Sequence, residues 1–182
     1  MTAPRRLLGM LVLCWLGAAF GATTPADYQV KAVFLFNFTQ FVNWPRESFA
    51  DAQAPFVIGV LGHDPFGRAL DDAVRGEHVG DRPLVIERYR TRAEVKPCQI
   101  LFIDRSAAGE AEPVLRALER AGTLTVTDFD VDTSPDVIIR FFTENQRIRL
   151  RINMDAARTA GLTISSKLLR PSQVVDSTAG RG

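Results

Sequence analysis

A nearly continuous apolar stretch runs from residue 31 to residue 45. Thr24 is a residue type that caps helices and Pro25 fits a first helical turn, so a helix is predicted to begin there. Pro45 restricts the residue before it and predicts that the helix ends at residue 43 or 44. The main apolar stripe of this helix consists of Val30, Val33, Phe34, Phe38 and Phe41. A helix this apolar is expected at the centre of the domain or in an oligomer contact.

Short apolar runs alternate with helical patterns through the middle of the chain. The expected strands are 56–61, 83–87, 100–103 and 123–127, and the expected helices are 68–74 and 113–121. Strands that are apolar on both faces belong to a parallel sheet covered on both sides. The pattern therefore predicts an α/β fold with a Rossmann-like, mostly parallel sheet and helices on both faces.

Two adjacent strand-like runs, 137–142 and 147–153, predict an antiparallel hairpin joined by a four-residue turn. One face of this hairpin is apolar and belongs in the core. The other face carries Arg140, Phe142, Arg147, Arg149 and Arg151. With this turn Arg140 would lie opposite Arg149, and like charges across strands are destabilising. Either nearby carboxylates such as Glu144 offset them in a solvated face, or the face binds an acidic partner surface or an anionic ligand.

The first 22 residues have the pattern of a secretory signal peptide. Arg5 and Arg6 precede an apolar run that ends at residue 20, and small residues follow it. The run is short for a membrane span. We therefore expect export and cleavage of residues 1–22, one domain over residues 23–171, and a flexible tail over residues 172–182.

Removal of the leader changes the charge and the cysteine content. Losing Arg5 and Arg6 takes the 22 basic residues to 20, against 21 acidic ones, so the mature net charge is near −1. That balance does not favour a nucleic-acid partner. Cys98 is the one cysteine outside the leader, so no intrachain disulfide is expected. A buried thiol is one interpretation of Cys98, and an intermolecular disulfide or redox-sensitive thiol is the alternative.

The chain has no pattern typical of metal binding or catalysis. Asp128, Asp130 and Asp132 alternate as at the start of a calcium loop, but the glycine and glutamate that such a loop needs are missing. Neither His63 nor His78 has a metal-ligand spacing, and no serine has the surroundings of a nucleophile elbow. We expect no metal, no cofactor and no enzymatic activity.

A glycine-rich turn at residues 62–67 follows the first expected strand of the sheet. It places His63, Asp64 and Phe66 at a carboxyl end, where α/β sheets commonly bind ligands. The spacing of its glycines matches neither the dinucleotide fingerprint nor the P-loop. A structural turn is expected, and small-ligand binding is the alternative.

Four segments resemble the YfiR/HmsC family: residues 31–45, 62–67, 98–103 and the closing segment 152–169 with Ile152-Asn153 and Ala160-Gly161-Leu162-Thr163. Members of that family are periplasmic α/β proteins, typically dimeric, whose best-known representative represses a membrane-anchored diguanylate cyclase through its periplasmic sensor region. The resemblance implies a periplasmic regulator of cyclic-di-GMP signalling that binds a protein and performs no chemistry. The implied partner is the periplasmic domain of an inner-membrane diguanylate cyclase. A small-ligand-binding accessory module of a sensor kinase is the alternative.

The chain departs from the family pattern at two places. Where the family commonly has Gly-Gly-Met-Ile, this chain has Ser134-Pro135-Asp136-Val137-Ile138. Where the family has Phe-Glu-Ile-Asn in its final strand, this chain has Leu150-Arg151-Ile152-Asn153, with Arg151 in place of the glutamate. A partner contact made through that glutamate would have to differ here. The resemblance also implies a homodimer without stable membrane insertion after cleavage. Asn37, Gln40 and Trp44 are expected to contact the second copy, and the arginine-bearing hairpin is the candidate for partner contact.

Overall fold

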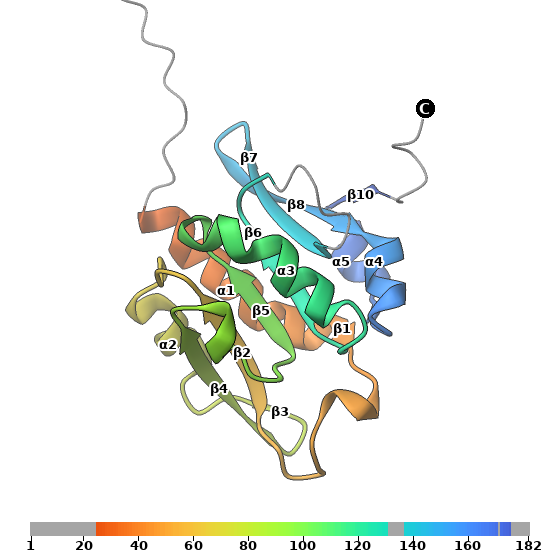
Figure 1. The fold of residues 1–182 in the computed structure, drawn as a ribbon. Coiled ribbons are helices and arrows are strands. Elements are labelled where there is room, and N and C mark those ends of the chain that lie inside the picture. Colours follow the sequence, from red (N-terminus) through yellow and green to blue (C-terminus); the bar gives the residue numbers. More distant parts are fainter. Residues whose placement is uncertain (1–24, 131–136, 171, 176–182) are drawn as a thin grey trace, which may run out of the picture.

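The computed structural model describes residues 25–130, 137–170 and 172–175. Within them, an eight-stranded sheet has the order β10-β8-β7-β6-β5-β2-β4-β3 (Figure 1). Its strands are β2 (Phe56–Leu61), β3 (His78–Val79), β4 (Arg82–Tyr89), β5 (Ile100–Ile103), β6 (Leu124–Thr127), β7 (Ile139–Glu144), β8 (Arg147–Asn153) and β10 (Gln173–Val175). Strands β4, β2, β5, β6 and β7 run parallel to one another. Strand β8 is antiparallel to β7 and parallel to β10, and β3 is antiparallel to β4. The predicted mostly parallel sheet with an antiparallel C-terminal hairpin is confirmed.

Helices cover both faces of this sheet (Figure 1). One face packs against α1 (Pro25–Phe41), α2 (Arg68–Val74), α4 (Met154–Thr159) and α5 (Ser166–Leu169). The other face packs against α3 (Ala108–Leu118). Short 3-10 turns are η1 (Arg46–Ser48), η2 (Arg92–Glu94) and η3 (Arg105–Ala107), and a small separate sheet pairs β1 (Val42–Asn43) with β9 (Thr163–Ile164). The Rossmann-like layering predicted from the alternating apolar runs is present.

Helix α1 lies at the centre of the larger core. Ala32, Leu35 and Phe38 are fully buried, and the Phe38 ring stacks on Phe141 of the hairpin at 6.0 Å between centroids. The helix ends at Phe41, earlier than Pro45 suggested, because Val42 and Asn43 take extended backbone to pair with β9. The apolar character of α1 therefore reflects a core position along one side of the helix.

The hairpin turn is shorter than predicted. Asn145 and Gln146 form a two-residue turn with φ of 50° and 59°, the left-handed conformation that tight hairpins favour. The predicted pairing of Arg140 with Arg149 is consequently wrong, since Arg140 lies opposite Arg151 and Phe142 lies opposite Arg149. A shift of two residues leaves side chains on the same face, so the predicted core face is retained. Its buried members are Ile139, Phe141, Leu150 and Ile152.

Helix α3 begins five residues before its predicted start. The Asp104 carboxylate accepts a hydrogen bond from the Ser106 backbone N–H and initiates η3, which leads directly into α3. Pro113, which was expected in the first turn, lies inside the helix instead. The start of this helix is therefore set by the cap at Asp104 upstream and does not depend on Pro113.

Cys98 is buried, with 3% of its surface exposed. Burial, and secondarily the charge of Glu87, raises the pKa of its thiol to about 12. The buried-thiol interpretation of Cys98 is confirmed. The expected leader and most of the expected tail lie outside the described residues, and β10 falls at the start of the tail segment.

Candidate functional site

The five predicted partner-binding residues lie together on one face of the β7–β8 hairpin. We call Arg140, Phe142, Arg147, Arg149 and Arg151 the arginine face; Arg140 lies opposite Arg151, and Phe142 opposite Arg149. The hairpin extends beyond the carboxyl ends of the parallel strands (Figure 1). The Arg151 guanidinium lies 5.5 Å from the centre of the Phe142 ring. The alternation of the sequence was sufficient to find this face.

The arginine face carries more positive charge than the described carboxylates around it neutralise. Arg140 pairs with Asp130, and Arg149 Nε lies 3.6 Å from a Glu144 oxygen, an ion pair too long for a hydrogen bond. The buried Nε atoms of Arg140 and Arg149 have no hydrogen-bond partner among the described residues. Burial lowers the pKa of Arg140, and the charge of Arg151 lowers it further. Ion pairs with two described carboxylates thus form on a face that carries four arginines, and this excess of positive charge favours the approach of an acidic partner.

The predicted dimer residues divide between two environments. Asn37 and Gln40 lie on the side of α1 that also exposes Val30 and Val33, which are 46% and 52% exposed. The predicted apolar stripe is therefore divided, since Phe38 is buried in the core while Val30 and Val33 face outward. Trp44 packs within its own chain, because its indole N–H donates to the Gln99 carbonyl at 2.9 Å and its ring meets Phe56 edge-on. We call Val30, Val33, Asn37 and Gln40 the α1 face.

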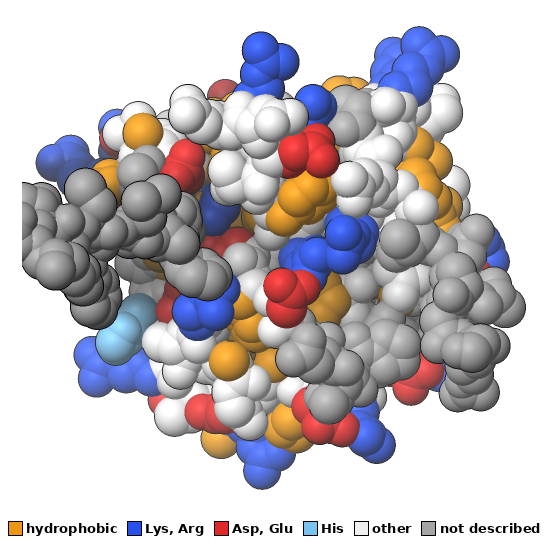
Figure 2. Space-filling model, turned by 90° about the horizontal axis from the view of Figure 1, so that it is seen from above, with side chains coloured by type: hydrophobic (Ala, Val, Ile, Leu, Met, Phe, Trp, Pro, Cys, Tyr) orange, Lys and Arg blue, Asp and Glu red, His pale blue; other side chains and the backbone are white. Residues whose placement is uncertain are grey.

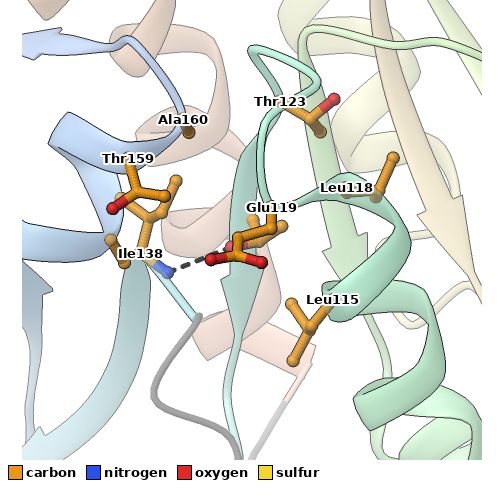
Figure 3. A pocket seen from close by; sticks show the side chains of 9 residues that line it. Leu115, Leu118, Glu119, Thr123, Ile138, Thr159 and Ala160 are labelled. Carbon is orange, nitrogen blue, oxygen red and sulfur yellow. Dashed lines mark hydrogen bonds between the residues drawn. The ribbon is translucent and has the colours of Figure 1, made fainter.

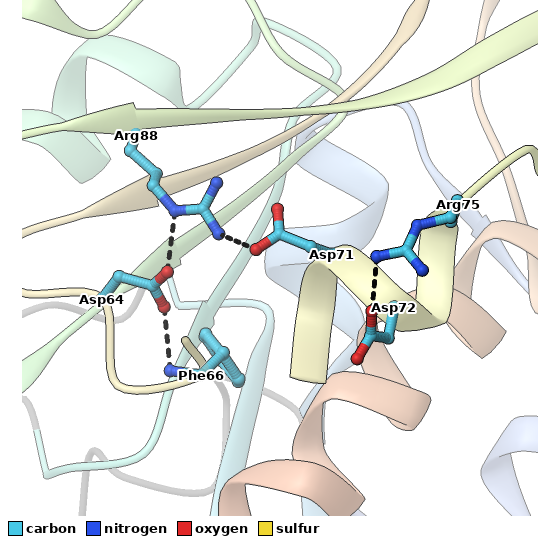
Figure 4. Close-up of polar contacts among 6 residues, drawn as sticks. All are labelled: Asp64, Phe66, Asp71, Asp72, Arg75 and Arg88. Atoms are coloured by element: carbon cyan, nitrogen blue, oxygen red, sulfur yellow. Dashed lines mark hydrogen bonds and ion pairs between the residues drawn. The ribbon is translucent and has the colours of Figure 1, made fainter. Parts of the chain in front are cut away.

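The turn at residues 62–67 is held by a network of charged side chains (Figure 4). The Asp64 carboxylate accepts hydrogen bonds from the Phe66 backbone N–H at 2.8 Å and from Arg88 Nε at 2.7 Å. Arg88 also donates to Asp71 on α2 at 2.9 Å, so the turn is tied to both β4 and α2. Phe66 is buried edge-on against Phe102, which leaves His63 as the exposed member of the predicted ligand turn.

An open cleft of about 970 Å³ lies beside this turn. It is lined by Gly62, His63, Asp64, Arg88, Tyr89, Arg90, Ser106, Ala107 and Glu110. Residues 62–64 follow β2, residues 88–90 end or follow β4, and residues 106–110 lie in η3 and the first turn of α3, so three separate parts of the chain meet there. Figure 2 shows this end of the molecule, where basic and acidic side chains are interspersed around hydrophobic patches. The sequence pointed to His63 but not to Arg90 or Ser106, because only the strand order brings them together.

A buried ion pair joins α1 to the end of β6. Lys31 Nζ lies 2.6 Å from an Asp128 oxygen, with the two side chains only 4% and 5% exposed. The Tyr28 hydroxyl donates to the same carboxylate oxygen at 2.9 Å, and the Lys31 ammonium lies 4.2 Å from the Tyr28 ring centre. Burial raises the pKa of Tyr28 and the Asp128 charge raises it further. One lysine within an apolar helix was the sequence feature that could have pointed to this pair.

A second, very small cavity of about 10 Å³ lies between α3, β6 and α4 (Figure 3). Beside it the Ile138 backbone N–H donates to the Thr125 hydroxyl at 3.0 Å. Its volume is close to that of one water probe, so it is too small for an organic ligand.

The described residues contain neither a metal-binding cluster nor a helix that could span a membrane. No group of His, Cys, Asp and Glu side chains in that part of the chain is arranged to hold a metal ion. None of the helices described there is long and apolar enough to cross a membrane.

Comparison with solved structures gives one informative likeness. The ABC domain in complex with L-Trp from Streptococcus pneumonia matches 81% of this chain with a TM-score of 0.52 and 10% identity. The match spans 60% of that chain, and at this identity it supports the α/β fold alone. No curated protein matches the chain.

Comparison with family models gives a match over almost all of the described domain. The model described as YfiR/HmsC-like matches residues 28–173, from the start of α1 to β10. Proteins of this family are periplasmic regulators of diguanylate cyclase signalling. The chain therefore belongs to the YfiR/HmsC-like family.

Proposed function

We propose that the protein is exported to the periplasm, binds the extracytoplasmic sensor region of an inner-membrane diguanylate cyclase and represses that enzyme. Family membership supports the regulatory class. The arginine face supports this mode of action, because it gathers four arginines on one side of a hairpin and pairs them with two described carboxylates. Guanidinium groups pair strongly with carboxylates, so the contacted surface of the cyclase is acidic.

Deletion of the gene is expected to raise cellular cyclic-di-GMP and biofilm formation, because the cyclase loses its repressor. Both quantities are measured in the deletion strain and in strains that carry the gene on a plasmid. The complete gene should restore the low level. A matched gene lacking codons 2–22 should not restore it, because the product stays on the wrong side of the membrane. Unchanged cyclic-di-GMP in the deletion strain would contradict repression.

The α1 face supports a homodimer as the working form of the regulator. It exposes two valines beside Asn37 and Gln40, and no charged side chain lies among the outward residues between 29 and 41. Two copies related by a two-fold axis would therefore meet here without opposing like charges. Asn37 and Gln40 would supply polar contacts to the second copy.

Replacing Val33 with glutamate is expected to convert the dimer to a monomer, because each interface would then bury an unpaired carboxylate close to its symmetry mate. Light scattering coupled to size-exclusion chromatography measures the mass in solution. Gln53→Glu is the matched control, since it adds the same charge at an exposed loop position. A Val33→Glu variant that keeps the wild-type dimer mass would place the interface elsewhere.

A further inference from the structure

The open cleft lies at the point where the sheet reverses its strand order. From β2 the chain passes to β4 on one side, and then to β5 on the other side of β2. The segments that leave β2 and β5 diverge there, which opens a crevice at the carboxyl ends of the strands. The cleft of about 970 Å³ occupies this position, with Gly62 and His63 on one side and Ser106 on the other.

The two sides of the cleft are fixed relative to each other by a direct hydrogen bond. The His63 backbone N–H donates to Ser106 Oγ at 2.8 Å, and the Gly62 backbone N–H donates to the Tyr89 carbonyl at 2.9 Å. Gly62 has a φ of 97°, and a Cβ there would lie 2.6 Å from Ser106 Oγ. A side chain at position 62 would therefore obstruct the cleft and strain the turn.

The carboxylates on the cleft wall are already hydrogen-bonded within the chain. Asp64 accepts from Arg88 Nε and from the Phe66 backbone N–H. Glu110 accepts from the Arg92 backbone N–H at 2.8 Å. The Arg88 guanidinium is likewise occupied, because it bridges Asp64 and Asp71. These groups form the wall of the cleft and are less available to a ligand.

The groups that remain available are donors. Arg90 is exposed at the cleft. Its backbone N–H donates to Glu94, and within the described part of the chain its guanidinium has no hydrogen-bond or ion-pair partner. Ser106 Oγ accepts from His63 N–H, which leaves the hydroxyl hydrogen free to donate. The exposed His63 imidazole lies beside them and can donate through its protonated ring nitrogen. A ligand that meets these groups must supply acceptors.

We propose that this cleft binds a small oxyanion, with a carboxylate or phosphate group held by Arg90, Ser106 and His63. Arg90 supplies the charge and a planar pair of donors, and Ser106 and His63 fix the position of the ligand. The carboxyl ends of β2 and β5, which the cleft residues follow, lie at the same end of the sheet as the tip of the β7–β8 hairpin (Figure 1). The inference does not rest on the proposed repression, because binding is measured on the isolated protein.

Titration calorimetry of the full mature chain tests the site with succinate and inorganic phosphate as probes and glycerol as the uncharged control. At least one anion is expected to bind with a dissociation constant of about 1 mM or tighter, and glycerol is not. Arg90→Gln should weaken that binding at least about tenfold, since a charge-assisted contact is worth more than 1.4 kcal/mol. The matched control is Arg92→Gln, two residues away and outside the cleft lining, and it should bind as the wild type does.

The His63 ring provides a second measurement that does not depend on how the variants fold. Its NMR resonances in the wild-type protein should shift on saturation with the bound anion, while those of His78, at the distant β3, should not. If Arg90→Gln and Arg92→Gln lose affinity equally, or if the resonances of His63 and His78 shift equally, the anion is attracted by general charge alone. Either result would overturn the site. Absence of binding by either anion would overturn it as well.

Discussion

Replacing Lys31 with methionine is expected to lower the free energy of unfolding by about 3–5 kcal/mol, the usual cost of removing one partner from a buried ion pair. The substitution leaves the Asp128 carboxylate buried, with the Tyr28 hydroxyl as its remaining side-chain hydrogen-bond donor among the described residues. Methionine fills a similar volume to lysine, so little of the loss comes from a cavity. Urea unfolding followed by circular dichroism measures the change.

Two companion variants isolate the cause of this loss. Arg75→Met removes a cation from the Arg75–Asp72 pair, whose side chains are 69% and 54% exposed, and should cost less than about 1 kcal/mol. Adding Asp128→Asn to Lys31→Met should recover part of the stability, because the amide oxygen still accepts from Tyr28 without a buried charge. A Lys31→Met variant no less stable than Arg75→Met would show that the ion pair is not the source.

The sheet was predictable because its central strands are apolar on both faces. Phe56–Leu61 and Ile100–Ile103 have the predicted bounds, and both are completely buried. The hairpin faces were predictable for a related reason, because side chains alternate along a strand. A register shift by an even number of residues, as here, leaves each side chain on its predicted face. The register itself depended on the left-handed conformations of Asn145 and Gln146, which the residue types permit but do not impose.

The candidate site was less predictable because its parts are distant in sequence. Lys31 and Asp128 are 97 residues apart, and only the packing of α1 against the end of β6 brings them together. Arg90 and Ser106 meet His63 through the strand order, which no local pattern specifies. On α1, Val30 and Val33 are as apolar as the buried residues, so hydrophobicity alone did not show which side of the helix faces outward.

Under the proposed function, the two faces of the hairpin have different roles, one in stability and the other in recognition. The inner face packs on α1 through Phe141, which contacts both Phe34 and Phe38. On the arginine face Arg140 and Arg151 repel each other directly across the strands. This repulsion lowers the stability of the fold, and a surface that serves binding is expected to keep such a cost. Replacing one of the two arginines can therefore raise stability while it weakens binding.

Replacing Arg151 with glutamate is expected to stabilise the isolated protein by up to about 1 kcal/mol, because a cross-strand repulsion with Arg140 becomes an attraction. The same change should weaken binding to an acidic cyclase surface at least about 30-fold, or about 2 kcal/mol, because one guanidinium contact is lost and a repulsive charge is introduced. Urea unfolding gives the first quantity. Cyclic-di-GMP in the deletion strain carrying the variant gene gives the second, and it should stay high.

The opposite signs exclude a trivial loss of folding as the reason for lost repression. Arg120→Glu, an equal charge change at an exposed position just beyond α3, should repress as well as the wild type does. Full repression by Arg151→Glu would show that the partner contacts another surface. Lost repression together with lost stability would instead make Arg151 a structural residue, since relief of its repulsion with Arg140 requires the folded protein to become more stable.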